Sequence, residues 1–366
     1  PLNTLGCRPC LTGSLTTGID NFVGDSGNNT FIGGNGATPT FGPADQLDGG
    51  AGTDTLKLFG GAVDGLGIPG IKNIENVYLN ATSGSLNVSG IAGVTALELD
   101  NVAAATFTLG ATQALKLSNQ LAAVTVAGSV AGGVTLNGVG TAATAGVAAA
   151  PMILNAPAAS TSLNLTTATK ASLITLTGAA LTSVTVAGDQ ALTLDATGVA
   201  LTSVDASAAT AGVNYTNAGT LDLTFTGGAG ADRVNLGASV TAADKLDGGA
   251  GVDTLAIAGA TSLTTAAVAG IKGFEVLETV GATTQDASVF APANVLTGLS
   301  VGSVAAGTAY TTAVTNLAAT AKDNIKVSDT AAKSTVTVSV KDFVSGGTSD
   351  TATVTYTGAE KTAAST

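Results

Sequence analysis

The sequence predicts an all-β protein, a parallel β-solenoid or β-roll that is internally duplicated and ends in a C-terminal antiparallel β region. Three observations predict this fold. A short stretch rich in glycine and aspartate occurs in several copies, apolar residues recur in pairs at alternating positions, and both features return after about 200 residues. Repetition of this kind is typical of stacked coils, each of which buries its apolar side chains against its neighbours.

The glycine-rich stretch reads DQLDGGAGTDTL at residues 45–56 and DKLDGGAGVDTL at residues 244–255. Both copies contain the pattern G-G-x-G-x-D-x-U-x, in which U is a large apolar residue. The glycines permit left-handed backbone angles that aim carbonyl oxygens inward, the aspartate adds a carboxylate, and the leucine two residues later points into a core. We therefore expect each copy to form a calcium-binding turn of a parallel β-roll.

A third copy, GGAGADRV, occupies residues 227–234 and begins 21 residues before Gly248. One full coil of two nonapeptides needs roughly 18 residues, so the two turns should stack on one edge. Calcium prefers six to eight oxygen ligands, which Asp232, Asp253 and glycine carbonyls would supply. Residues 24–31 form a degraded fourth copy, in which Asn29 stands where Asp232 stands, and this predicts a weaker site.

Ca²⁺ is the expected cofactor, and no catalytic residue is predicted. The candidate ligands of the first module are Asp25, Asn29, Asp45, Asp48, Gly50, Gly52 and Asp54. Those of the second are Gly228, Gly230, Asp232, Asp244, Asp247, Gly249, Gly251 and Asp253. Scattered aspartates such as Asp195, Asp222 and Asp342 are interpreted as solubilising surface charge.

Composition excludes several classes of protein. The net charge is −12 with only 13 Lys and Arg residues, which is unlike a nucleic-acid binder, and 10% charged residues is unlike a disordered chain. Residues 117–169 carry no charge, but polar residues interrupt them too often for a transmembrane segment, so they are interpreted as a buried ladder. The chain starts without Met or a signal peptide, as expected of a processed form, a fragment or a protein exported by another route.

The only cysteines, Cys7 and Cys10, lie in a C-x-x-C arrangement. Because no helix-opening pattern follows, a local disulfide is the first interpretation, a covalent link to another subunit the second, and a thioredoxin-like role the third. The chain has no histidine, so a zinc site would lack ligands.

Five segments follow in order. Residues 1–14 form an N-terminal segment, 15–80 the first calcium-binding module, 81–222 a solenoid ladder, 223–300 the second calcium-binding module and 301–366 the C-terminal antiparallel module. Each calcium turn is followed by a similar rung, GIKNIENV at 70–77 and GIKGFEVL at 270–277. The order of turn and rung thus occurs twice, which indicates a duplication.

The ladder consists of apolar pairs separated by one residue, which recur every 8 to 11 residues. The pairs are Leu86/Val88, Leu97/Leu99, Phe107/Leu109, Leu115/Leu117, Val124/Val126, Val134/Leu136, Leu163/Leu165, Ile174/Leu176, Val184/Val186, Leu192/Leu194 and Leu221/Leu223. Alternation of this kind predicts short strands in a flattened solenoid of roughly 20 residues per coil. An α-helix would need a different period and disfavours Gly, Thr and Val, so only the alanine-rich insertion 141–150 is compatible with a helical turn.

The last part of the chain has longer alternating runs at 324–328, 334–340 and 351–356, with Gly346-Gly347 as a turn. Runs of this length joined by glycine turns favour antiparallel pairing. We expect a small sandwich or a cap on the roll here.

The acidic turns, the stretch DNFVGDSGNNTF at 20–31 and the rung with its low-charge ladder resemble the RTX (repeats-in-toxin) family. More closely, they resemble RTX-bearing surface-layer proteins of Gram-negative bacteria. The resemblance implies calcium binding, type I secretion and assembly into a lattice on the cell surface. The chain departs from that family in lacking a long tandem block of nonapeptides near its C-terminus, so its few sites are expected to be structural.

The first functional hypothesis is a structural, self-assembling extracellular protein stabilised by Ca²⁺: an S-layer, matrix or filament subunit at the cell surface. Its expected partner is another copy of itself, with cell-surface polysaccharide as a further candidate. The alternative is a segment of an RTX adhesin that binds cells or surfaces. A β-helical polysaccharide-degrading enzyme is less favoured, because the chain has no His or Trp and only Arg233 lies near a calcium turn.

Overall fold

The protein is all-β, with 2% helix, and forms a parallel β-solenoid of about 14 turns, which confirms the predicted fold class. This computed structural model describes residues 12–63, 70–144, 147–217, 219–259, 262–291, 293–302, 311–321, 323–327, 335–341 and 351–357. Cys7 and Cys10 lie outside the described residues. The chain divides into two compact units, unit 1 (1–194) and unit 2 (195–366), which are described separately.

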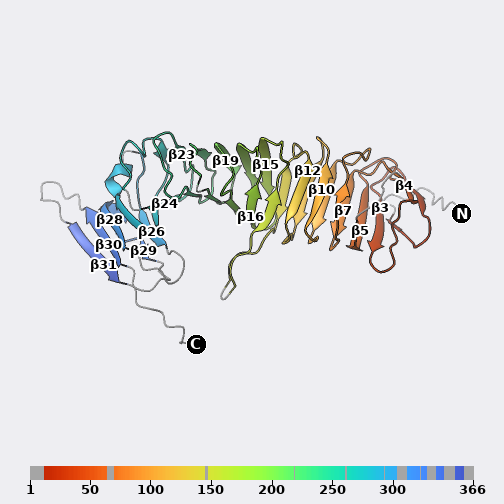
Figure 1. Cartoon of the computed structure of the whole chain (residues 1–366), viewed down its shortest axis with the longest axis horizontal. Helices are drawn as coiled ribbons and strands as arrows, with labels where there is room; N and C mark the ends of the chain where they lie inside the picture. Colours follow the sequence, from red (N-terminus) through yellow and green to blue (C-terminus); the bar gives the residue numbers. More distant parts are fainter. Residues whose placement is uncertain are drawn as a thin grey trace, which may run out of the picture. The chain divides into compact units, whose positions relative to one another are not determined.

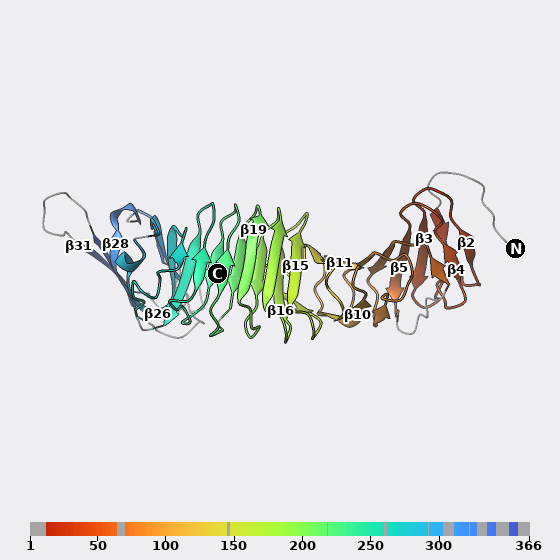
Figure 2. The same ribbon diagram turned by 90° about the horizontal axis from the view of Figure 1, so that it is seen from above.

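In unit 1, the strands that pair in parallel within a sheet are two places apart in the order of strands along the chain (Figures 1 and 2). One sheet contains β1 (Thr12–Ser14), β3 (Thr30–Asn35), β5 (Thr55–Gly61), β7 (Asn76–Asn80), β9 (Ala96–Asp100), β11 (Ala114–Ser118), β13 (Val134–Asn137), β15 (Ser162–Thr167) and β17 (Ser183–Gly188). A second contains β8 (Leu86–Asn87), β10 (Ala105–Leu109), β12 (Val124–Gly128), β14 (Met152–Asn155) and β16 (Ser172–Thr177). A short third sheet contains β2 (Asn21–Val23), β4 (Gln46–Asp48) and β6 (Ile71–Lys72).

Unit 2 continues the same plan after β18 (Leu192–Asp195), which spans the boundary. One sheet contains β19 (Ser203–Ala209), β21 (Thr224–Thr226), β23 (Lys245–Asp247) and β25 (Ile271–Lys272). The other contains β20 (Val213–Thr216), β22 (Arg233–Asn235), β24 (Thr254–Gly259), β26 (Val276–Asp286), β28 (Thr311–Ala318), β30 (Thr335–Lys341) and β31 (Thr351–Thr357). The strands β27 (Gly298–Gly302) and β29 (Ile325–Val327) pair beside β26, and two 3₁₀ turns lie at Ala287–Phe290 and Ala319–Ala321.

The core of unit 1 is a stack of buried apolar residues that includes the predicted pairs. In unit 1, Val77 pairs with Leu97, Leu97 with Leu115 and Leu115 with Val134, and all four side chains are buried. The alternating residues of the same strands face outward. Each buried aliphatic side chain stabilises the fold by about 1.5 to 3 kcal/mol, so stability accumulates coil by coil.

The C-terminal region differs from the prediction. The strands β26, β28 and β30 pair in parallel, as do β27 and β29, and among the described C-terminal strands only β30 and β31 pair antiparallel. Alternation of apolar residues is the same in both kinds of pair, so the pattern could not distinguish them. The solenoid thus extends into the predicted antiparallel module, and the correction applies to its strand direction.

In the insertion, residues 141–144 pair antiparallel with residues 147–150 and project from unit 1 (Figure 1), so these residues do not form the helical turn with which the composition was compatible. Backbone hydrogen bonds of 2.8 Å join Thr141 and Ala150, and bonds of 3.0 Å join Thr144 and Val147. Among the described residues, no helix has the length and apolar character needed to cross a membrane.

Candidate metal centre

In each unit, every glycine-rich turn connects a short strand to the next strand of the coil. In unit 2 the turn 227–232 joins β21 to β22, and the turn 248–253 joins β23 to β24. The strands β21 and β23 pair in parallel, as do β22 and β24, so the two turns are stacked on adjacent coils. The aspartate that ends each turn is the residue immediately before the following strand.

These final acidic residues form a column along unit 2. The backbone N–H of Asp232 donates to Asp253 Oδ1 at 2.7 Å, and the N–H of Asp253 donates to Glu275 Oε2 at 2.9 Å. Asp232 in turn accepts a 2.6 Å hydrogen bond from Val213 N–H. We call Asp232, Asp253 and Glu275 the capping column of unit 2, because each side chain caps the backbone of the preceding coil.

One oxygen of this column is left without a partner. Asp253 is 0% exposed, and within the described part of the chain its Oδ2 accepts no hydrogen bond. A methyl group on Gly248 would lie 2.9 Å from this oxygen and 1.9 Å from the carbonyl oxygen of Gly273. The two oxygens therefore converge on the same small space beside the Gly248 backbone, which only a glycine leaves open.

The same arrangement recurs one coil earlier. A methyl group on Gly227 would lie 1.9 Å from the Gly248 carbonyl oxygen and 2.6 Å from Asp232 Oδ2. Here Oδ2 accepts a 2.7 Å hydrogen bond from Gly228 N–H. The capping column of unit 2 therefore presents two stacked pairs, each made of a carboxylate oxygen and a carbonyl oxygen.

Burial and mutual repulsion raise the proton affinity of this column. Burial raises the pKa of Asp253 to about 6, and the nearby carboxylates of Asp232, Glu275 and Asp247 add to the effect, against a hydrogen bond from Asp232 N–H. Burial also raises the pKa of Asp232, although the N–H groups of Val213 and Gly228 oppose it. The column thus holds more negative charge than its own donors neutralise.

Unit 1 carries the matching column of Asn29, Asp54 and Glu75. The backbone N–H of Asn29 donates to Asp54 Oδ1, and the N–H of Asp54 donates to Glu75 Oε2 at 2.6 Å. Asp54 is 0% exposed, and its Oδ2 also has no partner among the described residues. A methyl group on Gly49 would lie 2.5 Å from this oxygen and 1.8 Å from the Asn73 carbonyl oxygen. The Asp54 position therefore reproduces the Asp253 position.

The other position of the unit 1 column is different, because Asn29 is an amide. Its Nδ2 donates to Gly27 O at 2.6 Å, to Gly49 O at 3.1 Å and to Asp54 Oδ1 at 3.1 Å. The carbonyl of Gly49 corresponds to that of Gly248, which lies beside Asp232 Oδ2 in unit 2. The amide of Asn29 thus donates to the Gly49 carbonyl, whereas the corresponding Gly248 carbonyl in unit 2 lies beside a carboxylate.

The predicted ligands Asp45 and Asp244 lie apart from the capping columns. Asp45 accepts hydrogen bonds from the N–H groups of Asp20 and Gly42, at 2.9 and 2.8 Å. Asp244 accepts them from Leu223 and Thr241, at 2.7 and 2.8 Å. Both oxygens of each carboxylate are used, so these residues hold the loop before the strand to the preceding coil.

Asp48 and Asp247 form ion pairs at the end of their strands. Lys72 Nζ lies 2.8 Å from Asp48 Oδ2, and Lys272 Nζ lies 2.9 Å from Asp247 Oδ2. Burial by itself would raise the pKa of Asp48. Hydrogen bonds from Lys72 and Asn73 outweigh burial and hold this pKa below its ordinary value. These carboxylates are thus neutralised by lysines that the metal prediction did not include.

The glycines of the pattern have two separate roles. Gly50 and Gly52 adopt φ angles of +88° and +124°, and Gly249 and Gly251 adopt +92° and +132°, as the turn pattern predicts. Gly228 and Gly230 do not adopt left-handed backbone angles. They are needed because the backbone of the preceding coil lies very close: a methyl group on Gly228 would lie 2.1 Å from Ala209 O, and one on Gly230 would lie 2.3 Å from Ala211 C. Asp25, at the first turn, accepts a 2.8 Å hydrogen bond from Gly27 N–H.

Glu75 and Glu275 were not among the predicted site residues, although both belong to the capping columns. Both occur at the same place in the repeated rung, directly before β7 and β26, and this repetition was the available signal. The described residues contain no group of three or more His, Cys, Asp or Glu side chains arranged to hold a metal ion. A cation at the columns would therefore draw on carbonyl oxygens as well as carboxylates, which are the hard donors that calcium prefers.

Comparison with protein-family models gives no match, and neither does comparison with curated proteins.

Proposed function

We propose that the protein is a structural, self-assembling extracellular subunit whose coils are stabilised by Ca²⁺. The β-solenoid fold is compatible with a structural or repeat protein. The observation that carries the calcium part of the proposal is the buried Oδ2 of Asp253, which has no partner within the described chain and faces the Gly273 carbonyl.

A fixed charge in this position needs compensation. Asp253 accepts one hydrogen bond at Oδ1, but leaving the second oxygen of a buried carboxylate without a partner costs free energy, and neighbouring carboxylates increase that cost. Asp232, Asp253, Gly248 and Gly273 would hold the ion in unit 2, while Asp54 and Asn73 would contribute in unit 1. Bound calcium would supply positive charge that joins adjacent coils. A site that combines few carboxylates with backbone carbonyls suits the higher calcium concentrations outside cells.

Self-assembly is supported by the architecture. A strand of a solenoid that is left without a neighbour has an unused hydrogen-bonding edge, and such edges pair readily with another chain. If calcium binds the folded coils and not the unfolded chain, it shifts the equilibrium toward coils that are ordered for docking. This proposal places the protein at the cell surface, includes the kinship to RTX-type surface-layer proteins, and assigns it no catalytic activity.

The test combines electron microscopy with thermal unfolding. Purified protein is imaged by negative stain in millimolar calcium and again after EGTA, with magnesium at equal concentration as the control. We expect ordered arrays or filaments and a raised melting temperature with calcium, and dispersed particles with EGTA or magnesium. Arrays that persist unchanged in EGTA would contradict the role of calcium, and monomers in all three conditions would contradict self-assembly.

A further inference from the structure

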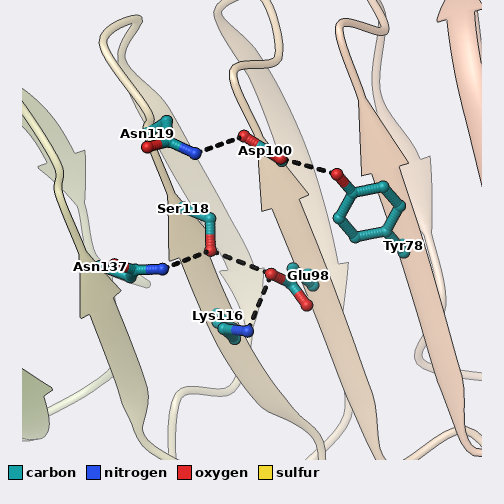
Figure 3. A network of polar contacts seen from close by, with 7 residues as sticks. All are labelled: Tyr78, Glu98, Asp100, Lys116, Ser118, Asn119 and Asn137. Atoms are coloured by element: carbon teal, nitrogen blue, oxygen red, sulfur yellow. Dashed lines mark hydrogen bonds and ion pairs between the residues drawn. The ribbon is translucent and has the colours of Figure 1, made fainter. Parts of the chain in front are cut away.

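The outward face of β5, β7, β9, β11 and β13 in unit 1 carries a group of side chains that the capping columns do not involve (Figure 3). We call it the Tyr78 face, and its members are Lys57, Phe59, Tyr78, Glu98, Asp100, Lys116, Ser118, Asn119 and Asn137. The strand register aligns Lys57, Tyr78, Glu98 and Lys116 in one row across four strands. Neighbouring strands lie about 4.8 Å apart, so the row presents a polar or aromatic group at every step.

This face holds two of the few aromatic side chains that reach solvent. Among the aromatic residues whose burial the structure describes, Phe22, Phe59 and Tyr78 are the ones that are not buried. Phe59 is 40% exposed, and its ring centroid lies 5.9 Å from that of Tyr78. Tyr78 itself is half-buried, and its ring lies on β7 beside Asp100 (Figure 3). Phe59 and the exposed part of Tyr78 thus add an aromatic surface to an otherwise polar row.

Hydrogen bonds fix the position of Tyr78. Its hydroxyl donates to Asp100 Oδ2 at 2.6 Å, and Asn119 Nδ2 donates to Asp100 Oδ1 at 3.0 Å. Burial, assisted by the Asp100 carboxylate, raises the pKa of Tyr78 to about 12. The hydroxyl therefore remains protonated and keeps the ring in one orientation, which reduces the entropy that a ligand must overcome on binding.

The flanking groups offer both donors and acceptors. Glu98 Oε1 accepts from Lys116 Nζ and from Ser118 Oγ, each at 2.9 Å. Lys57 Nζ lies 5.8 Å from the centroid of the Tyr78 ring. An ammonium group has three N–H donors, so a single carboxylate partner leaves Lys116 able to donate again. The face thus combines a fixed ring with polar groups on both sides.

We propose that the Tyr78 face binds a neutral polysaccharide. A sugar ring has one apolar C–H surface that packs on an aromatic ring and a rim of hydroxyls that both donate and accept hydrogen bonds. Lys57 and Lys116 balance the charges of Glu98 and Asp100, and Lys170, whose Nζ donates to Asn119 Oδ1 at 3.1 Å, adds one positive charge at the edge of the face. The face therefore carries little net charge, and the net charge of −12 of the whole chain disfavours an acidic ligand. The row across the strands fits an extended chain of sugars rather than a single sugar.

This inference goes beyond the proposed structural role and does not depend on calcium or on self-assembly. It is tested by native affinity electrophoresis of the full chain in gels that contain dextran, mannan or xyloglucan as neutral probes, or alginate as an acidic probe. We expect at least one neutral polysaccharide to retard the protein. Tyr78→Ala should weaken this retardation at least about tenfold, and Tyr78→Phe should retain most of it because the ring remains.

The matched control is Ile153→Ala, which removes an exposed apolar side chain from β14 in another sheet of the same unit. It should leave retardation unchanged, and circular dichroism should show native folding of every variant. The proposal is overturned if none of the neutral probes retards the protein, if only alginate does, or if folded Tyr78→Ala is retarded like the unchanged protein. Loss of self-association in Tyr78→Ala without retardation of the parent would assign the face to a second copy instead.

Discussion

The two capping columns have the same backbone plan but different chemistry at one position. In unit 1, the Asn29 amide donates to Gly27 O, Gly49 O and Asp54 Oδ1, so this one position of the column is satisfied without a cation. In unit 2, Asp232 occupies the equivalent position and can only accept, so its carboxylate lies beside that of Asp253. The difference shows how one side chain decides whether a stacked turn is satisfied internally or needs a cation.

The remaining positions of the columns are alike, which makes the comparison informative. Asp54 and Asp253 each leave Oδ2 unpartnered within the described residues, and Glu75 and Glu275 each cap the next N–H. Calcium should therefore stabilise both units, but unit 2 more strongly. Exchanging residues between the two units tests whether the position that differs sets the response to calcium.

The largest effect is expected from Asn29→Asp, which gives unit 1 the chemistry of unit 2. In EGTA, the new buried carboxylate loses three donated hydrogen bonds and faces Asp54, so local stability should fall on the order of 2 to 4 kcal/mol. Calcium should restore most of the loss. Hydrogen exchange of the peptides that cover 24–29 and 49–54 measures the change locally.

The converse exchange, Asp232→Asn, is the matched control. It should increase protection of the turn at 248–253 in EGTA and reduce the additional protection that calcium provides there. Equal calcium responses in the parent and in both variants would mean that this position does not set the need for a cation.

An intermediate effect is expected from pH in calcium-free protein. The pKa of Asp253 is about 6 in the folded state against an ordinary 3.8, so the folded state binds the proton more tightly. The resulting stabilisation is present below pH 3.8 and is lost as the pH rises through about 6, on the order of 3 kcal/mol. Urea unfolding in EGTA at a series of pH values, compared between the parent and Asp253→Asn, isolates this contribution.

Asp48 and other carboxylates of lowered pKa contribute with the opposite sign, so the difference between the two proteins is the informative quantity. The parent should lose stability relative to Asp253→Asn as the pH rises from 4 to 6. Parallel pH profiles for the two proteins would contradict the assignment of a repelled, buried carboxylate. Saturating calcium should reverse the difference, because the ion binds the deprotonated form.

The smallest effect is expected from Lys72→Met in unit 1. Lys72 is 65% exposed, and ion pairs of such exposed lysines contribute below about 1 kcal/mol. The pKa of Asp48 should rise toward its ordinary value while the melting temperature changes little. Carboxyl titration by NMR measures the first and calorimetry the second, and Lys272→Met provides the same comparison in unit 2. A large loss of stability would show that the lysine supports more than this ion pair.

Much of the fold could be predicted from the sequence, because alternation determines which side chains face inward. Leu97, Leu115 and Val134 are buried as their spacing predicts. Leu221 is an exception, since it is 51% exposed while Leu223 and Phe225 are buried, which shifts the expected pair by one step of alternation. Alternation cannot identify the neighbouring strand, and therefore the parallel pairing of β28 with β30 was not predicted.

The candidate site could be predicted less completely. The pattern placed Asp232 and Asp253 on stacked turns, but it could not show that their oxygens accept N–H groups from the adjacent coil. The roles of Glu275, of the amide of Asn29 and of the lysines depend on which coil lies beside which. That information comes from register, which a short repeated motif does not contain.

The most direct test of the central claim is anomalous X-ray scattering from crystals grown with calcium. The account predicts a calcium peak in unit 2 between the turns at 227–232 and 248–253, with oxygen ligands that include Asp253 and a glycine carbonyl. It predicts a second peak beside Asp54 and none at the amide of Asn29. Full-occupancy peaks only at Asp45 and Asp244, or no peak at either column in millimolar calcium, would contradict it.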